Sequence, residues 1–280
     1  MILSIASGKG GTGKTLIAAN IAISVGGNIQ LLDCDVEEPN LHLLLHPKVV
    51  SEETVYSMVP SVNEELCDHC GRCSSFCSYK ALFVTPMKIL VFPELCHGCG
   101  GCILACPKKA INEGKRIVGV LKRGYKNSIE LIYGELKIRE RMTTLLIREV
   151  KKHISRDEKD VIIDAPPGAS CPMVEAVRGS DFCILVTEPT PFGLYDLRIA
   201  IQVLRSMDIP FGVVINRAGI GDEKVYDYCR ENEIPILLEI PYQRRIAELY
   251  SMSIPFSLKI PEWREKFKVL LDEARRLIGK

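Results

Sequence analysis

A glycine-rich segment near the start of the chain has the residue types that hold phosphate groups. It runs through Ser7, Gly8, Lys9, Gly10, Gly11, Thr12, Gly13, Lys14 and Thr15. Because glycine has no Cβ, consecutive backbone N–H groups can turn inward around phosphate oxygens. We expect Lys14 to reach the β- and γ-phosphates of a nucleotide, and the Thr15 hydroxyl to bind Mg²⁺. Lys9 is a second lysine, which the ordinary pattern of such a loop lacks.

Acidic residues follow two short apolar runs elsewhere in the chain. Residues 29–33 are followed by Asp35, and residues 161–163 by Asp164 and then Gly168. Ligands bind at the carboxyl ends of strands in open α/β sheets, so both carboxylates are expected beside the phosphates. Asp35 is a candidate for orienting the attacking water or holding Mg²⁺, and Asp164 for holding Mg²⁺ through water. We expect the Gly168 N–H to face the γ-phosphate. For Asp35, a solvated helix cap is the alternative.

Eight of the twelve cysteines lie between residues 67 and 106, in two runs of identical spacing. The runs are Cys67, Cys70, Cys73, Cys77 and Cys96, Cys99, Cys102, Cys106. In the bacterial ferredoxin run, which has this spacing, the fourth cysteine of each run binds the other run's cluster. We therefore expect one [4Fe–4S] cluster on Cys67, Cys70, Cys73 and Cys106, and a second on Cys77, Cys96, Cys99 and Cys102. Zinc, which favours paired CxxC motifs, is the alternative.

Alternating strands and helices are expected to position these residues. The expected strands are 1–6, 29–33, 129–133, 161–164, 182–187, 211–216 and 235–240, and the expected helices 16–25, 193–207, 223–232 and 243–251. Apolar residues between Ile138 and Ile154 also recur at helical spacing. This alternation, without hairpin signals, predicts an α/β fold with a doubly wound, mainly parallel sheet. The amphipathic segment 263–278 is expected to dock on that sheet, and lying on a membrane surface is the alternative.

The composition favours neither nucleic acid nor a membrane as a partner. The 280 residues carry a net charge of +1, and 47% of them are apolar. No apolar run approaches the roughly 18 residues of a membrane span. The first apolar run is only as long as a strand, so we expect no signal peptide and a cytoplasmic location. Thiols stay reduced in the cytoplasm, which favours metal binding over disulfides for the cysteine runs.

Together, these motifs resemble the MinD/Mrp superfamily of deviant Walker A ATPases. The resemblance rests on the two-lysine loop, the acidic strand ends, and the sequence Val214-Ile215-Asn216-Arg217. It implies ATP and Mg²⁺ as ligands and a homodimer that closes on ATP. In that dimer, Lys9 would reach the partner's phosphates. It further implies that Asn216 contacts adenine, that Arg217 lies at the nucleotide, and that Pro241 packs near the base.

The eight cysteines resemble the branch of this superfamily that carries an inserted ferredoxin domain. The implied domains are a P-loop ATPase domain formed by residues 1–58 and 114–280, and a small α+β bacterial ferredoxin domain with two [4Fe–4S] clusters at residues 59–113. In the related nitrogenase iron protein, a cysteine seven residues beyond the corresponding aspartate binds a cluster shared between subunits. Cys171 has this spacing from Asp164. It is either a metal or redox site at a dimer axis or a buried structural thiol.

Two functions follow from this resemblance. In the first, ATP binding and hydrolysis close a dimer and drive electron transfer, or iron–sulfur or metallocofactor assembly, on a protein partner. In the second, the protein is a positioning or regulatory ATPase that uses the cysteine-rich insert as a redox sensor or docking module. A catalytic set of Lys9, Lys14, Asp35 and Asp164 serves both hypotheses.

Overall fold

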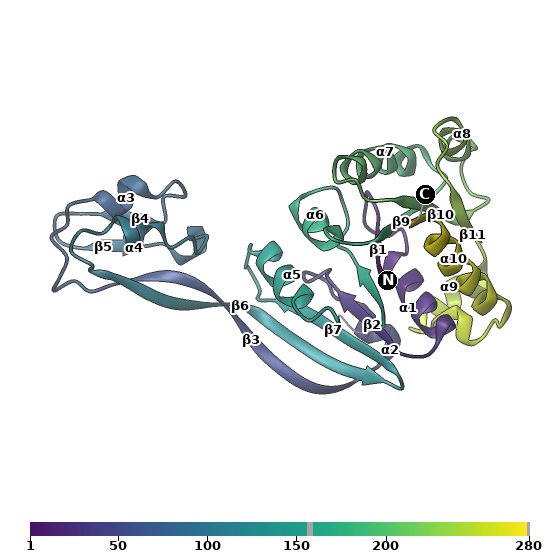
Figure 1. Ribbon diagram of the computed structural model, residues 1–280, viewed down its shortest axis with the longest axis horizontal. Coiled ribbons are helices and arrows are strands. Elements are labelled where there is room, and N and C mark those ends of the chain that lie inside the picture. The colour runs from purple at the N-terminus through teal and green to yellow at the C-terminus, as the bar shows by residue number, and fades with distance from the viewer. Residues whose placement is uncertain (156–158, 279–280) are drawn as a thin grey trace. The chain divides into compact units, whose positions relative to one another are not determined.

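The computed structural model describes residues 1–155 and 159–278. The chain forms two compact units (Figure 1). Unit 1 comprises residues 1–52, 121–135 and 147–280, and unit 2 comprises residues 53–120 and 136–146. Two long strands, β3 (Lys48–Val62) and β6 (Ile111–Lys126), have residues in both units. The chain therefore leaves unit 1 along β3, returns to it along β6, and contributes to unit 2 again at residues 136–146.

A nine-stranded sheet organises the described chain, in the order β11-β10-β9-β1-β8-β2-β7-β6-β3. Its other strands are β1 (Ile2–Ala6), β2 (Ile29–Asp33), β7 (Ile129–Leu136), β8 (Asp160–Asp164), β9 (Phe182–Thr187), β10 (Phe211–Ala218) and β11 (Ile236–Pro241). Every neighbouring pair from β11 to β7 is parallel. The predicted doubly wound, mainly parallel sheet is thus confirmed.

Helices cover both faces of the sheet. The helices of unit 1 are α1 (Lys14–Val25), α2 (Leu41–Leu45), α6 (Cys171–Val177), α7 (Pro191–Ser206), α8 (Lys224–Glu231), α9 (Arg244–Ser251) and α10 (Glu262–Ile278), and α5 (Thr143–Lys151) has residues in both units. Successive strand residues point to opposite faces, so Leu31 joins a core with Ile17 and Trp263 while Leu32 faces the other way. The face with Leu31 packs against α1 and α10.

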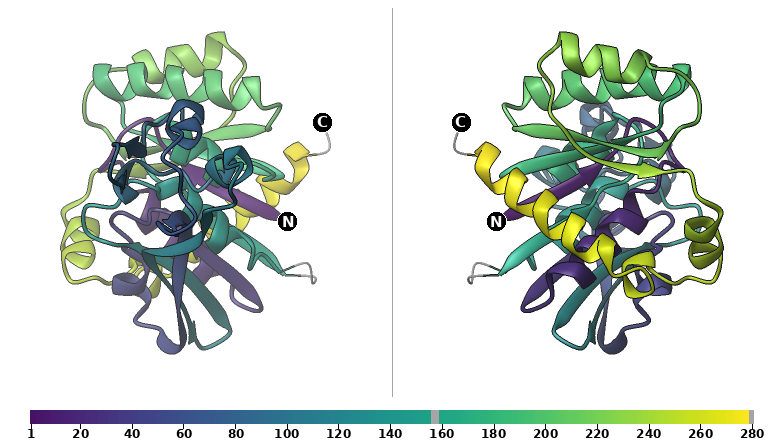
Figure 2. Two further views of the ribbon diagram at one scale, coloured as in Figure 1. Left: turned by 90° about the vertical axis from the view of Figure 1, so that its left-hand side faces the viewer. Right: turned by 90° about the vertical axis from the view of Figure 1, so that its right-hand side faces the viewer.

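The apolar face of the C-terminal helix packs against the sheet. Trp263, Phe267, Leu270, Leu271 and Ala274 of α10 are buried, and α10 lies across one face of the sheet (Figure 2). The expectation of a helix docked on the sheet is therefore confirmed. No helix among the described residues is long and apolar enough to cross a membrane.

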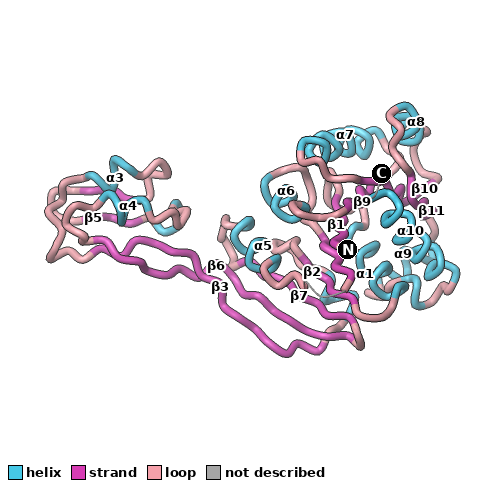
Figure 3. Tube along the Cα trace, viewed as in Figure 1, coloured by secondary structure: helices cyan, strands magenta, loops and turns pink. Residues whose placement is uncertain are grey.

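A hairpin interrupts the parallel pattern, contrary to the expectation from the sequence. β6 and β7 are neighbours in the sheet and are joined by Asn127 and Ser128 alone (Figure 3). A two-residue connection requires antiparallel strands, and Asn127 adopts a positive φ of 53° that suits such a turn. The helix expected over residues 138–154 is shorter than predicted. It spans only Thr143–Lys151, so Ile138 lies outside it.

Unit 2 is built around its cysteines. It contains the short helices α3 (Arg72–Phe76) and α4 (Gly101–Ala105) and the antiparallel pair β4 (Leu82–Val84) and β5 (Ile89–Val91). Its core consists of Cys73, Leu82, Ile89, Cys102 and Ile111, with three more cysteines of the two runs packed against it. Each short helix begins after a glycine in the left-handed region, Gly71 with φ 74° and Gly100 with φ 72°. Two cysteines thus take part in the packing that holds the unit together.

Candidate functional site

The glycine-rich loop connects β1 to α1, at the carboxyl end of a central strand. Gly11 and Gly13 adopt positive φ values of 75° and 93°, which side chains with a Cβ rarely adopt. A Cβ on Gly13 would also lie 2.5 Å from Asn216 Nδ2. Lys14, the first residue of α1, is buried. The loop therefore presents backbone N–H groups, a helix N-terminus and a lysine at one place, an arrangement that binds phosphate.

The acidic strand ends lie beside this loop because their strands are neighbours. β2 pairs with β8 so that Asp33 lies opposite Asp164. Asp33 accepts hydrogen bonds from the backbone N–H groups of Asp35, Asn40 and Leu41 at 3.0–3.1 Å. These bonds fix the segment that follows β2. Asp33 thus positions Asp35, a role that the sequence did not assign to it.

Asp164 is a buried carboxylate for which the described residues provide no hydrogen bond of ordinary geometry, although Lys14 and the Thr15 hydroxyl lie near it. Its side chain has no exposed surface, and neither carboxylate oxygen accepts a hydrogen bond within the part of the chain that the structure describes. Burial raises the pKa of Asp164 to about 7, although Lys14 and the Thr15 hydroxyl act in the opposite direction. Burial likewise raises the pKa of Asp35 to about 6, against the charge of Lys14. An unpaired buried carboxylate next to a phosphate loop fits a hydrated Mg²⁺ ion.

Glu188 connects the second lysine to another predicted site residue. It directly follows β9, and one of its oxygens pairs with Lys9 Nζ at 2.9 Å. Its other oxygen lies 2.6 Å from Arg217 Nη1. Glu188 is 5% exposed. The lysine expected to act across a dimer is therefore held by a carboxylate of its own protomer. Glu188 is not among the site residues predicted from the sequence, although, like Asp35 and Asp164, it lies at the carboxyl end of an apolar strand.

Of three other predicted nucleotide-binding residues, two form hydrogen bonds within the protein and the third lies at the end of a neighbouring strand. The Gly168 N–H donates to the Ser7 carbonyl at 3.0 Å. Asn216 Nδ2 donates to the Thr12 carbonyl at 2.7 Å, and its Oδ1 accepts from the Arg217 N–H at 2.9 Å. Pro241 ends β11, next to the β10 strand that carries Asn216. All three residues thus lie at the edge of the sheet that carries the loop, and two of them brace the loop itself.

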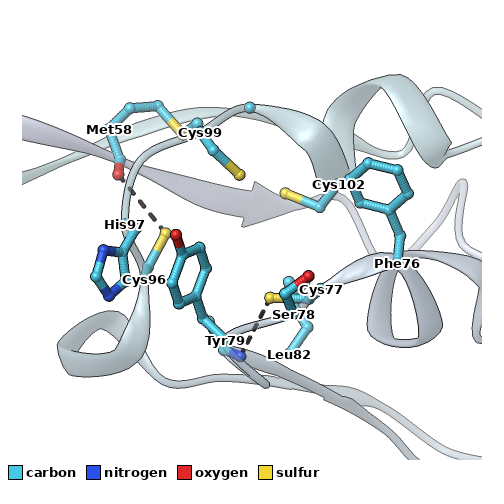
Figure 4. Close-up of a pocket in the computed structure, with 12 residues that line it drawn as sticks. Met58, Phe76, Cys77, Ser78, Tyr79, Leu82, Cys96, His97, Cys99 and Cys102 are labelled. Atoms are coloured by element: carbon cyan, nitrogen blue, oxygen red, sulfur yellow. Dashed lines mark hydrogen bonds between the residues drawn. The ribbon is translucent and has the colours of Figure 1, made fainter.

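Four cysteines surround one cavity in unit 2. Cys77, Cys96, Cys99 and Cys102 line a cavity of about 60 Å³, and their sulfur atoms face the same space (Figure 4). The walls are otherwise mainly apolar and include Phe76 and Tyr79, whose ring stacks on His97 with centroids 3.7 Å apart. Three of these cysteines belong to the second run and one to the first.

The other four cysteines line a second, smaller cavity. Cys67, Cys70, Cys73 and Cys106 surround it, together with Asp68, Pro107 and Lys108. Backbone N–H groups donate to sulfur in the same way in both runs. His69 and Gly98 donate to the first cysteine of each run, and Ala81 and Ala110 to the fourth, at 3.3–3.4 Å. The sequence repeat is thus a structural repeat, and its fourth cysteines are exchanged between the cavities.

These cysteine sets differ from the ligand set of a single ion. Among the described residues, no three His, Cys, Asp or Glu side chains are gathered closely enough to hold one metal ion. The thiolates of a cubane bind four different iron atoms and therefore lie farther apart than the ligands of one zinc ion. Eight thiols in two sets of four, with N–H groups aimed at sulfur, fit cubane clusters by donor type and number.

The remaining cysteines separate into one exposed and three buried thiols. Cys171 is exposed and is the first residue of α6. The alternative of a buried structural thiol is therefore wrong for Cys171. Cys34, Cys183 and Cys229 are buried, and burial raises the pKa of each of their thiols. These three residues are packing residues.

Comparisons with known proteins give a consistent relationship. The model of a family described as the CobQ/CobB/MinD/ParA nucleotide binding domain matches residues 3–256. An uncharacterized protein of Methanocaldococcus jannaschii is 32% identical over 258 residues, 89% of each chain. A Pyrococcus horikoshii protein named iron-sulfur cluster carrier protein is 23% identical over 309 residues, with 99% of this chain and 85% of the relative covered. The solved structure of septum site-determining protein MinD with Mg-ADP, also from P. horikoshii, matches with a TM-score of 0.61 at 22% identity, over 99% of this chain and 97% of MinD.

Proposed function

The chain belongs to the CobQ/CobB/MinD/ParA nucleotide-binding family, and on that premise we propose that it hydrolyses ATP to drive an iron–sulfur function in a homodimer. The observation that carries this proposal is the pairing of two sites in one chain. One is a phosphate loop with buried carboxylates beside it, and the other is a pair of cavities lined by four cysteines each.

At the nucleotide site, the roles follow from charge and position. Lys14 and the backbone of the loop hold the β- and γ-phosphates, while the Thr15 hydroxyl and Asp164 hold hydrated Mg²⁺. The ion supplies positive charge that neutralises the phosphate oxygens. Asp35 accepts a hydrogen bond from the attacking water and orients it toward the γ-phosphorus. ATP and water give ADP and phosphate, and the protein forms no covalent intermediate.

Dimer closure would require two contacts to open. Lys9 must leave Glu188 to reach the partner's phosphates, and the Gly168 N–H must leave the Ser7 carbonyl to face a γ-phosphate. Both contacts join the phosphate loop to the carboxyl end of a neighbouring strand. We propose that the γ-phosphate replaces Ser7 as the acceptor of the Gly168 N–H, and that this exchange signals nucleotide binding.

At the cysteine sites, each set of four would hold one [4Fe–4S] cluster. The clusters would supply one-electron redox chemistry. Donation of a cluster would require release from four cysteine ligands, so electron transfer to a partner is the favoured use of this pair. A relative named iron-sulfur cluster carrier protein supports the broader proposal of metallocofactor assembly. Cys171, the exposed thiol of α6, is the proposed place for a transient ligand at the dimer axis.

A second candidate is a positioning or regulatory ATPase in which unit 2 acts as a redox sensor. It is supported by the fold similarity to septum site-determining protein MinD, a cell division protein. The two candidates differ in what ATP changes. In the first, ATP alters the rate at which electrons or iron reach a partner. In the second, the redox state of unit 2 alters the rate of ATP hydrolysis.

Anaerobic purification followed by partner capture tests the proposal. We expect about eight iron atoms per chain from the ligand count, and a captured redox or cofactor-assembly protein whose reduction rate changes on addition of ATP. One or two zinc ions in place of iron would rule out the cluster assignment. Reduction of the partner at the same rate with ATP, with ADP and without nucleotide would instead favour the regulatory candidate.

A further inference from the structure

A groove in unit 1 lies at the edge of the sheet opposite the phosphate loop. It has a volume of about 360 Å³ and is formed where α1, α2, the β6–β7 turn and the segment before α10 meet. The phosphate loop follows the carboxyl end of β1, whereas this groove lies at the amino ends of β2 and β7. Its size is within the range of pockets that bind small molecules.

The walls of the groove are apolar and its charges are all positive. Ile23, Leu44, Leu45, Ile129, Ile254 and Leu258 provide the main apolar surface. The titratable side chains that line it are His46, Lys126 and Arg264, and no acidic residue lines it. Neither Lys126 nor Arg264 pairs with a carboxylate in the described ranges of the chain, although Arg264 Nε donates to the Ser257 carbonyl at 3.1 Å. An apolar pocket whose edge carries cations without a carboxylate partner complements a ligand that has an apolar body and one anionic group.

Two helices connect this groove to the nucleotide site. α1 begins at Lys14 of the phosphate loop, and Ile23 near its other end lines the groove. The N-terminal residue of α2, Leu41, donates its N–H to Asp33, which also positions Asp35. Leu44 and Leu45 of the same helix line the groove. A ligand in the groove therefore contacts both elements that place the catalytic residues.

We propose that this groove binds a small amphipathic anion, such as an aliphatic carboxylate, and that the bound ligand regulates ATP hydrolysis. Binding itself does not depend on the proposed activity, whereas regulation does. The carboxylate lies against Lys126 and Arg264, and the hydrocarbon chain lies against the leucine and isoleucine side chains. The class of ligand is inferred from the lining, since an anionic group would pair with two cations that no carboxylate of the described residues neutralises.

Calorimetry with octanoate and with octanol tests the ligand class in the full-length protein. We expect octanoate to bind at least about tenfold more tightly than octanol, because a charge-assisted contact contributes about that factor. Trp263 is the only tryptophan of the chain and precedes Arg264, so its fluorescence gives a second signal. Equal affinity for the two compounds, or no binding of octanoate, would overturn the proposal.

Three variants locate the binding. K126Q/R264Q should lower octanoate affinity to that of octanol, and S128F, which places a bulky ring in the β6–β7 turn, should abolish binding. R276Q changes another arginine of α10 outside the groove and should bind like the unmodified protein. Unchanged unfolding temperatures would show that all three variants fold. Octanoate binding by K126Q/R264Q and S128F at the unmodified affinity would place the ligand elsewhere and overturn the assignment.

ATP turnover in saturating octanoate tests the regulatory part. Turnover should change at least twofold in the unmodified protein and not in S128F. Retained binding with equal turnover in both proteins would overturn regulation and leave the binding site in place. Absence of turnover under all conditions would refute the proposed ATPase, and the calorimetric result would stand independently.

Discussion

Lys9 Nζ lies 2.9 Å from Glu188 Oε2, so each protomer holds its own second lysine in an ion pair. The lysine is about one-third exposed and the glutamate is nearly buried. Arg217 pairs with the other oxygen of Glu188. In the proposed dimer, closure over ATP would exchange this internal pair for contacts with the partner's phosphates. We therefore expect the pair to oppose closure until nucleotide is present.

Removing the carboxylate should make closure easier. We expect E188Q to dimerise at a several-fold lower ATP concentration, because a partly exposed ion pair contributes on the order of 1 kcal/mol. Light scattering during an ATP titration measures this effect. K9A should abolish ATP-dependent dimerisation, and E248Q, which alters an exposed carboxylate of α9, should leave it unchanged. A K9A protein that still dimerised on ATP would remove Lys9 from the interface.

Lys14 should be required for turnover. K14A removes the buried positive charge at the start of α1, and we expect ATP hydrolysis to fall at least about 100-fold, as for other lost transition-state contacts. The visible absorbance of unit 2 should not change. K224A alters an exposed lysine of α8 and serves as the control. Turnover by K14A at the unmodified rate would refute the site assignment.

The buried carboxylates predict how stability depends on pH. Burial raises the pKa of Asp164 from 3.8 to about 7, so the folded protein keeps a proton that the unfolded chain has lost. The free energy of unfolding must therefore fall as pH rises from about 4 to about 7, and the loss is complete above the folded pKa. Asp35, with its pKa raised to about 6, acts in the same direction.

Urea unfolding of the nucleotide-free protein at about pH 6 and about pH 8 measures this effect. We expect a decrease of about 1 kcal/mol or more, since one pKa unit corresponds to about 1.4 kcal/mol. D164N should reduce the decrease, whereas D272N, which changes an exposed carboxylate of α10, should not. Mg²⁺ and nucleotide should also reduce it, because Mg²⁺ binds the ionised carboxylate. If the free energy of unfolding fell equally with pH in D164N and in the unmodified protein, the pKa of Asp164 would not be raised.

Paired cysteine variants test the exchange between the two runs. Cys77 and Cys96 line the same cavity although they belong to different runs, so C77S/C96S should lose one cluster and keep about four iron atoms. Cys73 and Cys77 belong to one run but line different cavities, so C73S/C77S should lose both clusters. Iron analysis and electron paramagnetic resonance distinguish these results. The reverse outcome would mean that each run holds its own cluster.

The elements that position the nucleotide site could be predicted from the sequence because they are locally encoded. The runs at 182–187 and 211–216 each alternate with a helical segment, and the structure places β9, α7, β10 and α8 there. The family match confirms the resemblance to MinD-type ATPases. The branch with an inserted ferredoxin domain stays a prediction.

Long-range pairing could not be predicted in the same way. β3 and β6 are rich in charged and polar residues, and β3 contains Pro60. The sequence of neither segment therefore predicts a core strand. They pair with each other only because the chain returns from unit 2 beside its point of departure. The Lys9–Glu188 contact joins residues 179 positions apart. The sequence around Lys9 does not indicate that Glu188 is its partner, and the sequence around Glu188 does not indicate Lys9.

The adjacency of β3 and β6 has a consequence for how this chain could have arisen. Because these strands are neighbours in the sheet, a single insertion of coding sequence into a surface hairpin would add the cysteine-rich segment between them, whereas residues 136–146 of unit 2 lie elsewhere in the chain. β3 and β6 run side by side (Figure 3), so the reverse change would join shortened forms of these strands by a short turn. We therefore expect the cysteine-rich segment between β3 and β6 to be removable, and an engineered chain without it would show whether the nucleotide site folds on its own.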